Sequence, residues 1–491
     1  MRKIILIMLA TLMLSGCQNE IREIKSVDDL KTARIGVWAD SAYELKARDV
    51  LPNAEFVYLD FISDLVQNLK QNKIDTFVIG KTYVENLKFE GVAVDYLPQS
   101  LGDVPVSYIF PKNDRGQKLC GQMNEFIALL EQNGKLEELK TKWLRGDESK
   151  RTFTKSNLSG ENGTLIIGTD AQSTPFAYLR EGQVIGFEVE IMDKFCAAYG
   201  YKYEIKIESF PTMLADVMLG KIDVGMDAIE ILPERTKNVL FANPTQVEQA
   251  VAVINSESTG VFNITERIKT ALIDENRWKM ILDGALTTLA ITFCSIIFGT
   301  LLGLAVYMFY REKTPANRII DAIYRTLQGI PKMVLLLFFY YVVFGSINVP
   351  ASVVAVTVFS IVLSTSVFTM IKSGTESISI GQMEAALSLG FSERQAFVTF
   401  ILPQVIRNYF ANYQLQLNVI LLETAIVGYI SVQDLTRMAD LIRARTYDAF
   451  IPIVTIALVY LLISKALFLI TDAINRKIDP KNRRREEILP K

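Results

Sequence analysis

The stretch Phe61–Gly80 reads FISDLVQNLKQNKIDTFVIG, and Phe210–Ile229 reads FPTMLADVMLGKIDVGMDAI. Each begins with large apolar residues four positions apart, which predicts an amphipathic helix. Each then passes through Lys-Ile-Asp into an apolar run of strand length. Strand–helix–strand units favour parallel strands, so the sequence predicts two α/β lobes. The helix faces are expected to consist of Phe61, Leu65 and Leu69 in one lobe and Phe210, Leu214 and Met218 in the other.

Two shorter runs extend this internal similarity. IGVWAD at 35–40 and IIGTDA at 166–171 are apolar stretches that end near an acid, as a buried strand would. Residues 20–260 mix charged and apolar side chains, whereas residues 280–471 contain long apolar runs. A globular front half and a membrane-spanning back half are therefore expected.

Composition excludes several classes of function. The net charge of −2 gives no basis for nucleic-acid binding, and the absence of histidine excludes histidine-based catalysis and histidine–metal chemistry. No pair among Cys120, Cys196 and Cys294 has metal-binding spacing, so we expect no metal and no cofactor. Cys120 and Cys196 either pair in an oxidising compartment or remain separate buried thiols.

The N-terminus has the pattern of an export signal. Arg2 and Lys3 precede an apolar run from Ile4 to Leu14, which is too short to span a bilayer comfortably. The string Leu-Ser-Gly-Cys that ends at Cys17 resembles the bacterial lipobox. The resemblance implies a signal peptide at 1–17 and lipidation of Cys17; the alternative is an uncleaved anchor followed by a chance cysteine.

Several motifs together resemble the bacterial extracellular solute-binding proteins for polar amino acids. The resemblance implies a bilobed α/β fold that closes around a solute. These motifs are Gly168-Thr169-Asp170, Pro175-Phe176, Gly186–Val189, Pro233-Glu234-Arg235, Val239-Leu240-Phe241, Ser26–Lys31 and Asn133–Trp143.

The order of these motifs is inverted relative to that family. The second-lobe half and closing helix occupy 18–145, a polar linker follows at 146–162, and the first-lobe half occupies 163–256. A single circularly permuted domain accounts for this order, since joining termini that lie close together is tolerated. The alternative is two half-domains completed by another chain.

The resemblance also implies a set of solute-binding residues. Arg235 matches the arginine that holds a carboxylate, Phe210 an aromatic wall, Asp170 the acid after the first strand, and Ser41 a hydroxyl ligand in the second lobe.

Three positions depart from the family pattern. Ser173 replaces an aromatic lid, Glu230 replaces a serine, and Gly80, beside Lys81, stands where an acid is expected. In one interpretation Glu230 meets an amine while Lys81 meets a carboxylate. In the other, Glu230 neutralises Arg235 and specificity has moved away from α-amino acids.

The back half is expected to form an all-α transmembrane domain at 280–475 after a linker at 257–279, with a basic tail at 476–491. Five spans are predicted, with basic segments after the first and the last that place both on the cytoplasmic side. The first basic segment is Arg311, Lys313 and Arg318, and the second includes Arg476, Lys477 and Arg483–Arg485. The spans are placed at 280–309, 331–346, 350–372, 408–430 and 450–471.

Between the third and fourth spans, Gly381-Gln-Met-Glu-Ala-Ala386, then Gly390, then Leu402-Pro403, resembles the coupling loop of ABC importer permeases. The resemblance implies that Glu384, Ala385, Ala386 and Gly390 present a short helix to a separate ATPase. The sequence contains no G-x-x-x-x-G-K-[ST] string, so ATP hydrolysis is not expected in this chain.

The fourth span carries Asn412, Gln416 and Glu423 on roughly one face. Intramembrane polar groups line a pathway or bond to another helix, and both remain open for Glu423.

The sequence as a whole predicts a non-enzymatic importer subunit in the bacterial inner membrane, with its N-terminal domain outside. Its expected partners are an ABC ATPase, a second copy of the chain, and a small polar solute such as an amino acid or related carboxylate. The alternatives are a ligand-gated channel and a regulator, sensor or cell-wall enzyme with a bilobed domain.

Overall fold

A computed structural model describes residues 24–145, 151–152, 154–256, 264–312, 314–345, 347 and 349–478. The chain divides into two compact units. The sheet unit comprises Met1–Ile205, Ile222–Arg267 and Arg443–Ala449, and the helical unit comprises Lys206–Lys221, Ile268–Ile442 and Phe450–Lys491. The predicted signal peptide, Cys17, Lys313 and Arg483–Arg485 lie outside the described residues.

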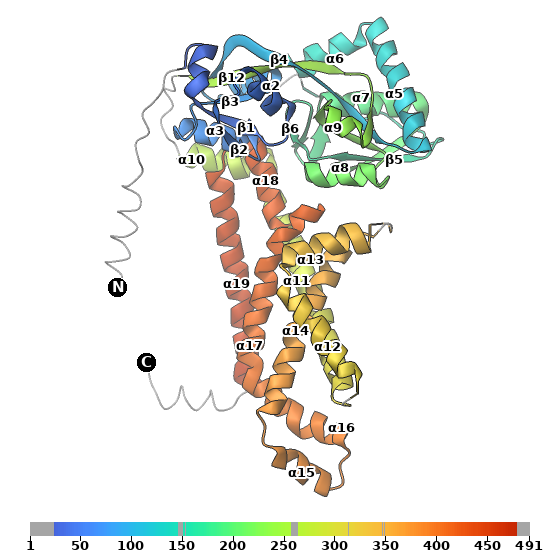
Figure 1. The fold of residues 1–491 in the computed structure, drawn as a ribbon, viewed down its shortest axis with the longest axis vertical. Helices are drawn as coiled ribbons and strands as arrows, with labels where there is room; N and C mark the ends of the chain where they lie inside the picture. Colours follow the sequence, from blue (N-terminus) through green and yellow to red (C-terminus); the bar gives the residue numbers. More distant parts are fainter. Residues whose placement is uncertain are drawn as a thin grey trace, which may run out of the picture. The chain divides into compact units, whose positions relative to one another are not determined.

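The front half alternates strands and helices, as its repeated strand–helix–strand pattern predicts (Figure 1). Its elements are η1 (Val27–Thr32), β1 (Arg34–Trp38), α2 (Ala42–Val50), β2 (Glu55–Leu59), α3 (Ile62–Lys70), β3 (Thr76–Gly80), α4 (Lys81–Phe89), β4 (Val94–Pro111), α5 (Asp114–Gln132), α6 (Lys135–Trp143), β5 (Thr164–Thr169), β6 (Gln172–Ser173), β7 (Ala177–Arg180), β8 (Gln183–Ile185), α7 (Phe187–Tyr199), β9 (Lys202–Ile207), α8 (Phe210–Met218), β10 (Val224–Glu230), α9 (Pro233–Thr236), β11 (Val239–Phe241) and β12 (Gln246–Asn255).

The back half is helical throughout its described residues. Its elements are α10 (Ile264–Ile268), η3 (Lys269–Ile273), η4 (Asp274–Asn276), α11 (Trp278–Tyr310), α12 (Ala316–Gly329), α13 (Lys332–Phe338), η5 (Phe339–Val343), α14 (Ala351–Glu376), α15 (Ile380–Ser388), α16 (Glu393–Ala396), η6 (Phe397–Ile401), α17 (Leu402–Glu423), η7 (Thr424–Ile430), α18 (Leu435–Thr446) and α19 (Phe450–Ile478). A mixed α/β domain followed by a helical region is thus confirmed.

The main sheet has nine strands in the order β2-β1-β3-β12-β4-β10-β5-β9, with β11 paired to β4. The predicted parallel strands are present, because β1 runs parallel to β2 and β3, and β10 runs parallel to β5. The sheet is not purely parallel, however. The 18-residue strand β4 pairs antiparallel with β12, β10 and β11, so both halves join into one mixed sheet.

The helix pattern is confirmed for α3 and corrected for α8. Leu65 and Leu69 are buried as predicted. In α8 the buried apolar residues are Met213 and Val217, whereas Met218 is 47% exposed. The buried face also carries Asp216, which accepts a hydrogen bond from Tyr340 Oη in the helical unit (2.9 Å). The spacing of apolar residues in the sequence could not predict this buried polar contact.

The sheet unit includes the segment Arg443–Ala449, which charged side chains hold in place. Arg443 lies over the ring of Phe61 (4.1 Å), and Arg445 pairs with Glu90 (2.6 Å). Asp448 pairs with Arg267 (2.6 Å). Partly buried ion pairs with such short contacts are screened less by salt than surface pairs.

Three helices of the helical unit are long and apolar enough to cross a membrane: α11, α14 and α19. The count rises to five if each bent pair forms one span, and the bend is 108° for Ala316–Gly329 with Lys332–Val343 and 52° for Glu393–Ile430 with Leu435–Thr446. The predicted second and fourth spans therefore belong to helix pairs that bend at short breaks. A hydropathy window averages over such breaks and does not detect them.

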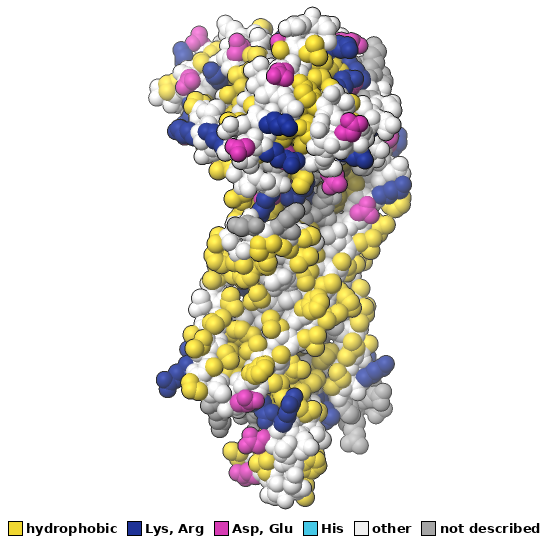
Figure 2. Space-filling model, turned by 90° about the vertical axis from the view of Figure 1, so that its right-hand side faces the viewer, with side chains coloured by type: hydrophobic (Ala, Val, Ile, Leu, Met, Phe, Trp, Pro, Cys, Tyr) yellow, Lys and Arg dark blue, Asp and Glu magenta, His cyan; other side chains and the backbone are white. Residues whose placement is uncertain are grey.

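The helices α11, α14, α17 and α19 run side by side in the helical unit (Figure 1). Gly299 and Gly303 of α11 face α14, where an added Cβ would lie 2.9 Å from Ser360 O and 2.7 Å from Ser364 O respectively. Such small residues let helix backbones approach closely in membranes. Hydrophobic side chains gather on the outside of this unit, as a lipid-facing surface requires (Figure 2).

Candidate functional site

The predicted arginine is held by an acid from the preceding strand. Glu230 ends β10, and α9 begins at Pro233 and carries Arg235. Arg235 Nη1 donates to Glu230 Oε2 at 2.5 Å, and Nη2 donates to the backbone oxygen of Asp40 at 3.0 Å. Both side chains are mostly buried. This geometry matches the interpretation in which Glu230 neutralises Arg235.

Asp170 follows β5, as the resemblance implies, and meets a second acid. Its backbone N–H donates to Asp227 Oδ2 (3.3 Å), and its Oδ1 accepts from the backbone N–H of Gln172 (2.8 Å). Asp170 and Asp227 are 5% and 6% exposed. Burial, and then the neighbouring Asp170, raise the pKa of Asp227 well above its usual range. The protonated form of Asp227 is therefore favoured.

A tyrosine and Ser173 adjoin this acid pair. The Ser173 hydroxyl is close enough to both Asp227 and Tyr83 to lower the pKa of each. The ring of Tyr83, from α4, packs against Phe176 with centroids 5.4 Å apart. Burial raises the pKa of Tyr83 well above its usual range, so this hydroxyl remains neutral. Thus α4 and β6, which come from different segments of the sequence, contribute to one polar cluster.

Gly80 ends β3 without a side chain, and two other groups fill the space. A Cβ at Gly80 would lie 2.7 Å from Tyr43 Oη and 2.8 Å from Glu248 Oε2. Glu248 lies on β12, whose residue Ala250 is paired with Gly80. The acid that the family pattern places at Gly80 is therefore replaced in space by a carboxylate from the neighbouring strand.

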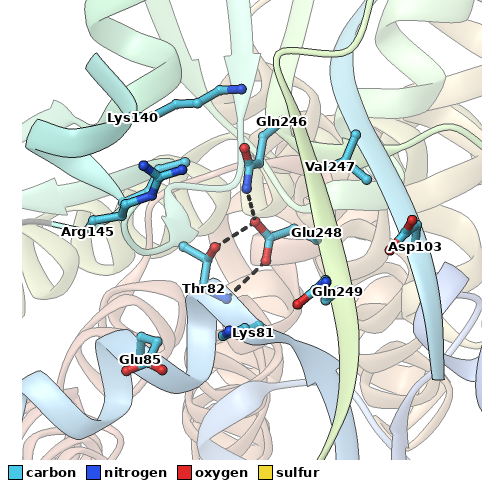
Figure 3. Close-up of a pocket in the computed structure, with 11 residues that line it drawn as sticks. Lys81, Thr82, Glu85, Asp103, Lys140, Arg145, Gln246, Val247, Glu248 and Gln249 are labelled. Atoms are coloured by element: carbon cyan, nitrogen blue, oxygen red, sulfur yellow. Dashed lines mark hydrogen bonds between the residues drawn. The ribbon is translucent and has the colours of Figure 1, made fainter. Parts of the chain in front are cut away.

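Glu248 also lines a polar pocket of 410 Å³ (Figure 3). Its two carboxylate oxygens accept from Thr82 Oγ1 (2.6 Å) and the Thr82 backbone N–H (3.0 Å), and Gln246 donates to it as well (3.0 Å). Lys81 also lines this pocket, and its Nζ lies 5.5 Å from the centre of the Tyr96 ring. Burial raises the pKa of Glu248, against the lowering effect of these hydrogen bonds.

Two other predicted residues are placed differently. Ser41 is 3% exposed and caps α2: its Oγ accepts from the Glu44 N–H (3.2 Å) and donates to Trp38 O (2.7 Å). The serine thus stabilises a helix end. Phe210 begins α8 and belongs to the helical unit rather than the sheet unit.

Four members of this site were not predicted from the sequence: Tyr43, Tyr83, Asp227 and Glu248. Asp227 had a readable signal, since it interrupts a fully buried strand, where an unpaired acid is costly. Glu248 and the two tyrosines gave none, because the pairing of β12 with β3 and the packing of α2 and α4 against the sheet bring them to Gly80 and Ser173.

The predicted coupling loop forms a short helix that ends in a glycine turn. Glu384 and Ala385 are exposed on α15, while Ala386 is buried. Gly390 has φ +88°, a conformation that favours glycine. The surrounding surface is apolar, with Ile380 75% and Leu389 76% exposed. Exposed apolar side chains on a short helix favour docking to a partner protein.

The polar residues of α17 fall into two groups. Asn412 is exposed and Gln416 is half-buried. Glu423 lies 3.7 Å from Lys332 Nζ, at the start of α13. Two polar residues that were not predicted bond to α19: Gln414 donates to Phe468 O (3.0 Å) and Asn418 accepts from Ser464 (2.6 Å).

Known proteins share both parts of this arrangement. The family described as bacterial extracellular solute-binding proteins, family 3, matches residues 165–407. The "Probable glutamine ABC transporter permease protein GlnP" of Bacillus subtilis is 30% identical over 193 residues, which are 38% of this chain and 88% of that protein. The arginine ABC transporter permease protein ArtQ of Haemophilus influenzae is 26% identical over 199 residues, covering 38% and 87%.

Among solved structures, an amino acid ABC transporter crystallised with histidines is 29% identical, with a TM-score of 0.39. It covers 44% of this chain and 100% of its own. The assignment rests on the sequence relatives and on the coupling-loop motif. The chain therefore belongs to the amino-acid ABC transporter permeases and carries, in the same polypeptide, a solute-binding domain of family 3.

Proposed function

We propose that this protein is the membrane-spanning subunit of an ABC importer for a small polar solute, an amino acid or a close derivative. The exposed helix α15, with Glu384, Ala385 and the left-handed Gly390, is the observation that carries the proposal. Such a helix gives a separate ATPase a surface to move, and the chain's own sequence lacks a phosphate-binding loop.

The sheet unit acts as the solute receptor. Its bilobed closure is supported by β4 and β12, the strands shared by both halves of the sheet. The candidate binding residues of this unit are Arg235, Asp170, Glu230, Lys81 and Ser41, to which the geometry adds Asp227, Glu248, Tyr43 and Tyr83. Strands that are shared by both halves suit hinge motion, because a few residues in them can absorb the change in backbone dihedral angles.

A single circularly permuted receptor domain is the organisation we propose. The strand β12, from the segment 163–256, lies between β3 and β4, from the segment 18–145. Reciprocally, β4 pairs with β10 and β11. Interleaved pairing of this kind supports one domain rather than two half-domains completed by another chain.

In the membrane we propose a homodimer with both basic segments in the cytoplasm and the receptor outside. Asn412 and Gln416 are our candidates for the solute pathway. For Glu423, the Lys332 contact favours a helix–helix role. The N-terminal Cys17 is proposed as a lipid anchor.

The importer function predicts ATP hydrolysis by a partner that co-purifies with this chain. We expect the complex, purified through a tag on the chain, to hydrolyse ATP faster when a mixture of amino acids and amines is added. Replacing Gly390 by alanine should lower the stimulated rate about tenfold, because alanine at positive φ costs roughly 1–2 kcal/mol.

Gly381→Ala is the matched control, since Gly381 is exposed, lies in the same loop region and has no positive φ. Solute-driven ion conduction without any co-purifying ATPase would contradict the importer and favour the ligand-gated channel.

A further inference from the structure

The polar pocket beside Glu248 has the size and the charge of a solute site (Figure 3). Its volume of 410 Å³ lies within the range of about 300–1,000 Å³ that small-molecule sites occupy. Three cations and three acids line it: Lys81, Lys140, Arg145, Glu85, Asp103 and Glu248. A lining with balanced charges complements a solute that carries both signs, rather than a polyanion or a polycation.

The end of α6 offers cations to a carboxylate. Lys140 lies in the last turn of this helix, and Arg145 follows the helix, with its backbone N–H donating to Lys140 O (3.2 Å). Among the residues that the structure describes, the Lys140 ammonium forms no hydrogen bond and no ion pair. Burial raises the pKa of Glu248, and the charge of Lys140 acts through space to lower it. Arg145 Nη1 donates to Glu137 Oε1 (2.6 Å), which leaves other guanidinium N–H groups for a solute.

The acids of the pocket differ in how far they are already satisfied. Glu248 is 1% exposed and accepts from Thr82 Oγ1 (2.6 Å) and from the Thr82 N–H (3.0 Å), so it is a fixed part of the wall. Glu85 accepts from Tyr96 Oη (2.7 Å). Asp103 is exposed on β4, and its side chain bonds to no other described residue. An ammonium group of a solute can therefore meet an acid in this pocket without breaking an existing bond.

Arg235 is a poorer anchor for a carboxylate than Lys140. Its guanidinium donates to Glu230 Oε2 at 2.5 Å and to the Asp40 backbone oxygen at 3.0 Å. A solute carboxylate would have to displace Glu230, which is 7% exposed and would then be a buried charge without that partner. Lys140 demands no such exchange, and Arg235 is not among the residues that line the pocket.

We infer that the receptor binds a zwitterionic amino acid in the pocket beside Glu248, with the solute carboxylate on Lys140 and Arg145 and not on Arg235. This inference rests on the proposed receptor function of the sheet unit. Lys140 is then the residue that selects a solute with a free carboxylate, because an amide in the same place would offer no negative charge to the ammonium group.

Amino acids and their α-amides test this inference on the purified full-length chain. The pairs are L-glutamine and L-glutaminamide, L-glutamate and L-isoglutamine, and L-lysine and L-lysinamide, which differ in side-chain charge. In one or more pairs, titration calorimetry should give about tenfold tighter binding of the amino acid. Equal or tighter binding of the amide in every pair would overturn the inference and leave the importer assignment standing.

Substitution of Lys140 locates the carboxylate. K140Q should weaken binding of the amino acid about tenfold and leave the amide unchanged, so that the preference between the two disappears. K135Q is the matched control, because Lys135 is exposed at the start of the same helix and does not line the pocket. A preference that persists in K140Q would overturn the inference, and its loss in R235Q would then place the carboxylate on Arg235. If none of these compounds binds a chain whose complex still shows amino-acid-stimulated ATP hydrolysis, the pocket inference fails and the importer assignment stands.

Discussion

At the scale of single residues, the site depends on side chains that fill space left by a glycine. Gly80 was recognised in the sequence as a missing acid, yet nothing there could show that Glu248 and Tyr43 converge on it. Glu248 reaches Gly80 through the register of β12 against β3, and Tyr43 reaches it through the packing of α2 against β3. The pairing of Glu230 with Arg235, by contrast, was one of the two interpretations that the sequence offered. These two residues lie only five positions apart in the chain.

Replacing Gly80 by alanine should destabilise the protein. The new Cβ would meet Tyr43 Oη and Glu248 Oε2 at under 3 Å, so both buried groups must shift. We expect a loss of about 1–3 kcal/mol, as for other overpacked cores. Thermal unfolding of the full-length chain in detergent measures it. Gly121→Ala is the control: Gly121 is an exposed helix residue with open space, and it should gain about 0.5–1 kcal/mol. Equal midpoints for both variants would contradict the packing described.

Glu188 gives a pH-dependent prediction. Burial raises its pKa to about 7, while its Oε2 accepts from the Ala228 N–H (2.9 Å). Because the folded pKa exceeds the unfolded value of about 4.3, the contribution of Glu188 to stability is complete below the unfolded pKa. It is lost as the pH rises through about 7.

The neutral variant E188Q should therefore be more stable than the wild type at pH 8, on the order of 2 kcal/mol, and differ little at pH 4. Melting midpoints at both pH values check this, with the exposed E234Q as control. A stability difference that is the same at pH 4 and pH 8 would show that Glu188 does not titrate in this range.

At the scale of elements, apolar periodicity predicted which segments form helices and strands but not how they pair. Leu65 and Leu69 face the core as expected, whereas α8 turns Met213 and Val217 inward because Asp216 anchors it to Tyr340. Long-range strand pairing, such as that of β4 with β12, produces no periodic pattern in the sequence. The bend between α12 and α13 escapes a hydropathy window because the window averages composition and carries no information on the direction of the chain.

The contact of α11 with α14 depends on small residues. Alanine at Gly303 would place its Cβ 2.7 Å from Ser364 O, which is backbone and cannot rotate away. We expect G303A to lower stability by about 1–3 kcal/mol, measured as a lower melting midpoint of the detergent-solubilised chain. Gly329→Ala, with open space around it, serves as control. A midpoint unchanged by G303A would argue against close packing of these helices.

At the scale of the whole molecule, the sequence predicted a solute-binding domain and a permease in one chain. The permease relatives and the match to solute-binding protein family 3 are consistent with that combination. The permease could be predicted from the sequence because its coupling loop is a local motif. The solute-binding domain was harder to predict, because its two segments are out of family order and the candidate site contains residues from both. Sequence comparison placed Arg235 and Asp170, but their buried partners required the three-dimensional pairing of strands.

The central claim is that this chain supplies both the receptor and the pathway of an ATP-driven importer. The most direct measurement is solute uptake into proteoliposomes that contain only the complex purified through this chain. We predict ATP-dependent accumulation without any added binding protein, and its loss in the G390A complex. Uptake that requires a separate binding protein, or that proceeds equally without ATP, would contradict the account.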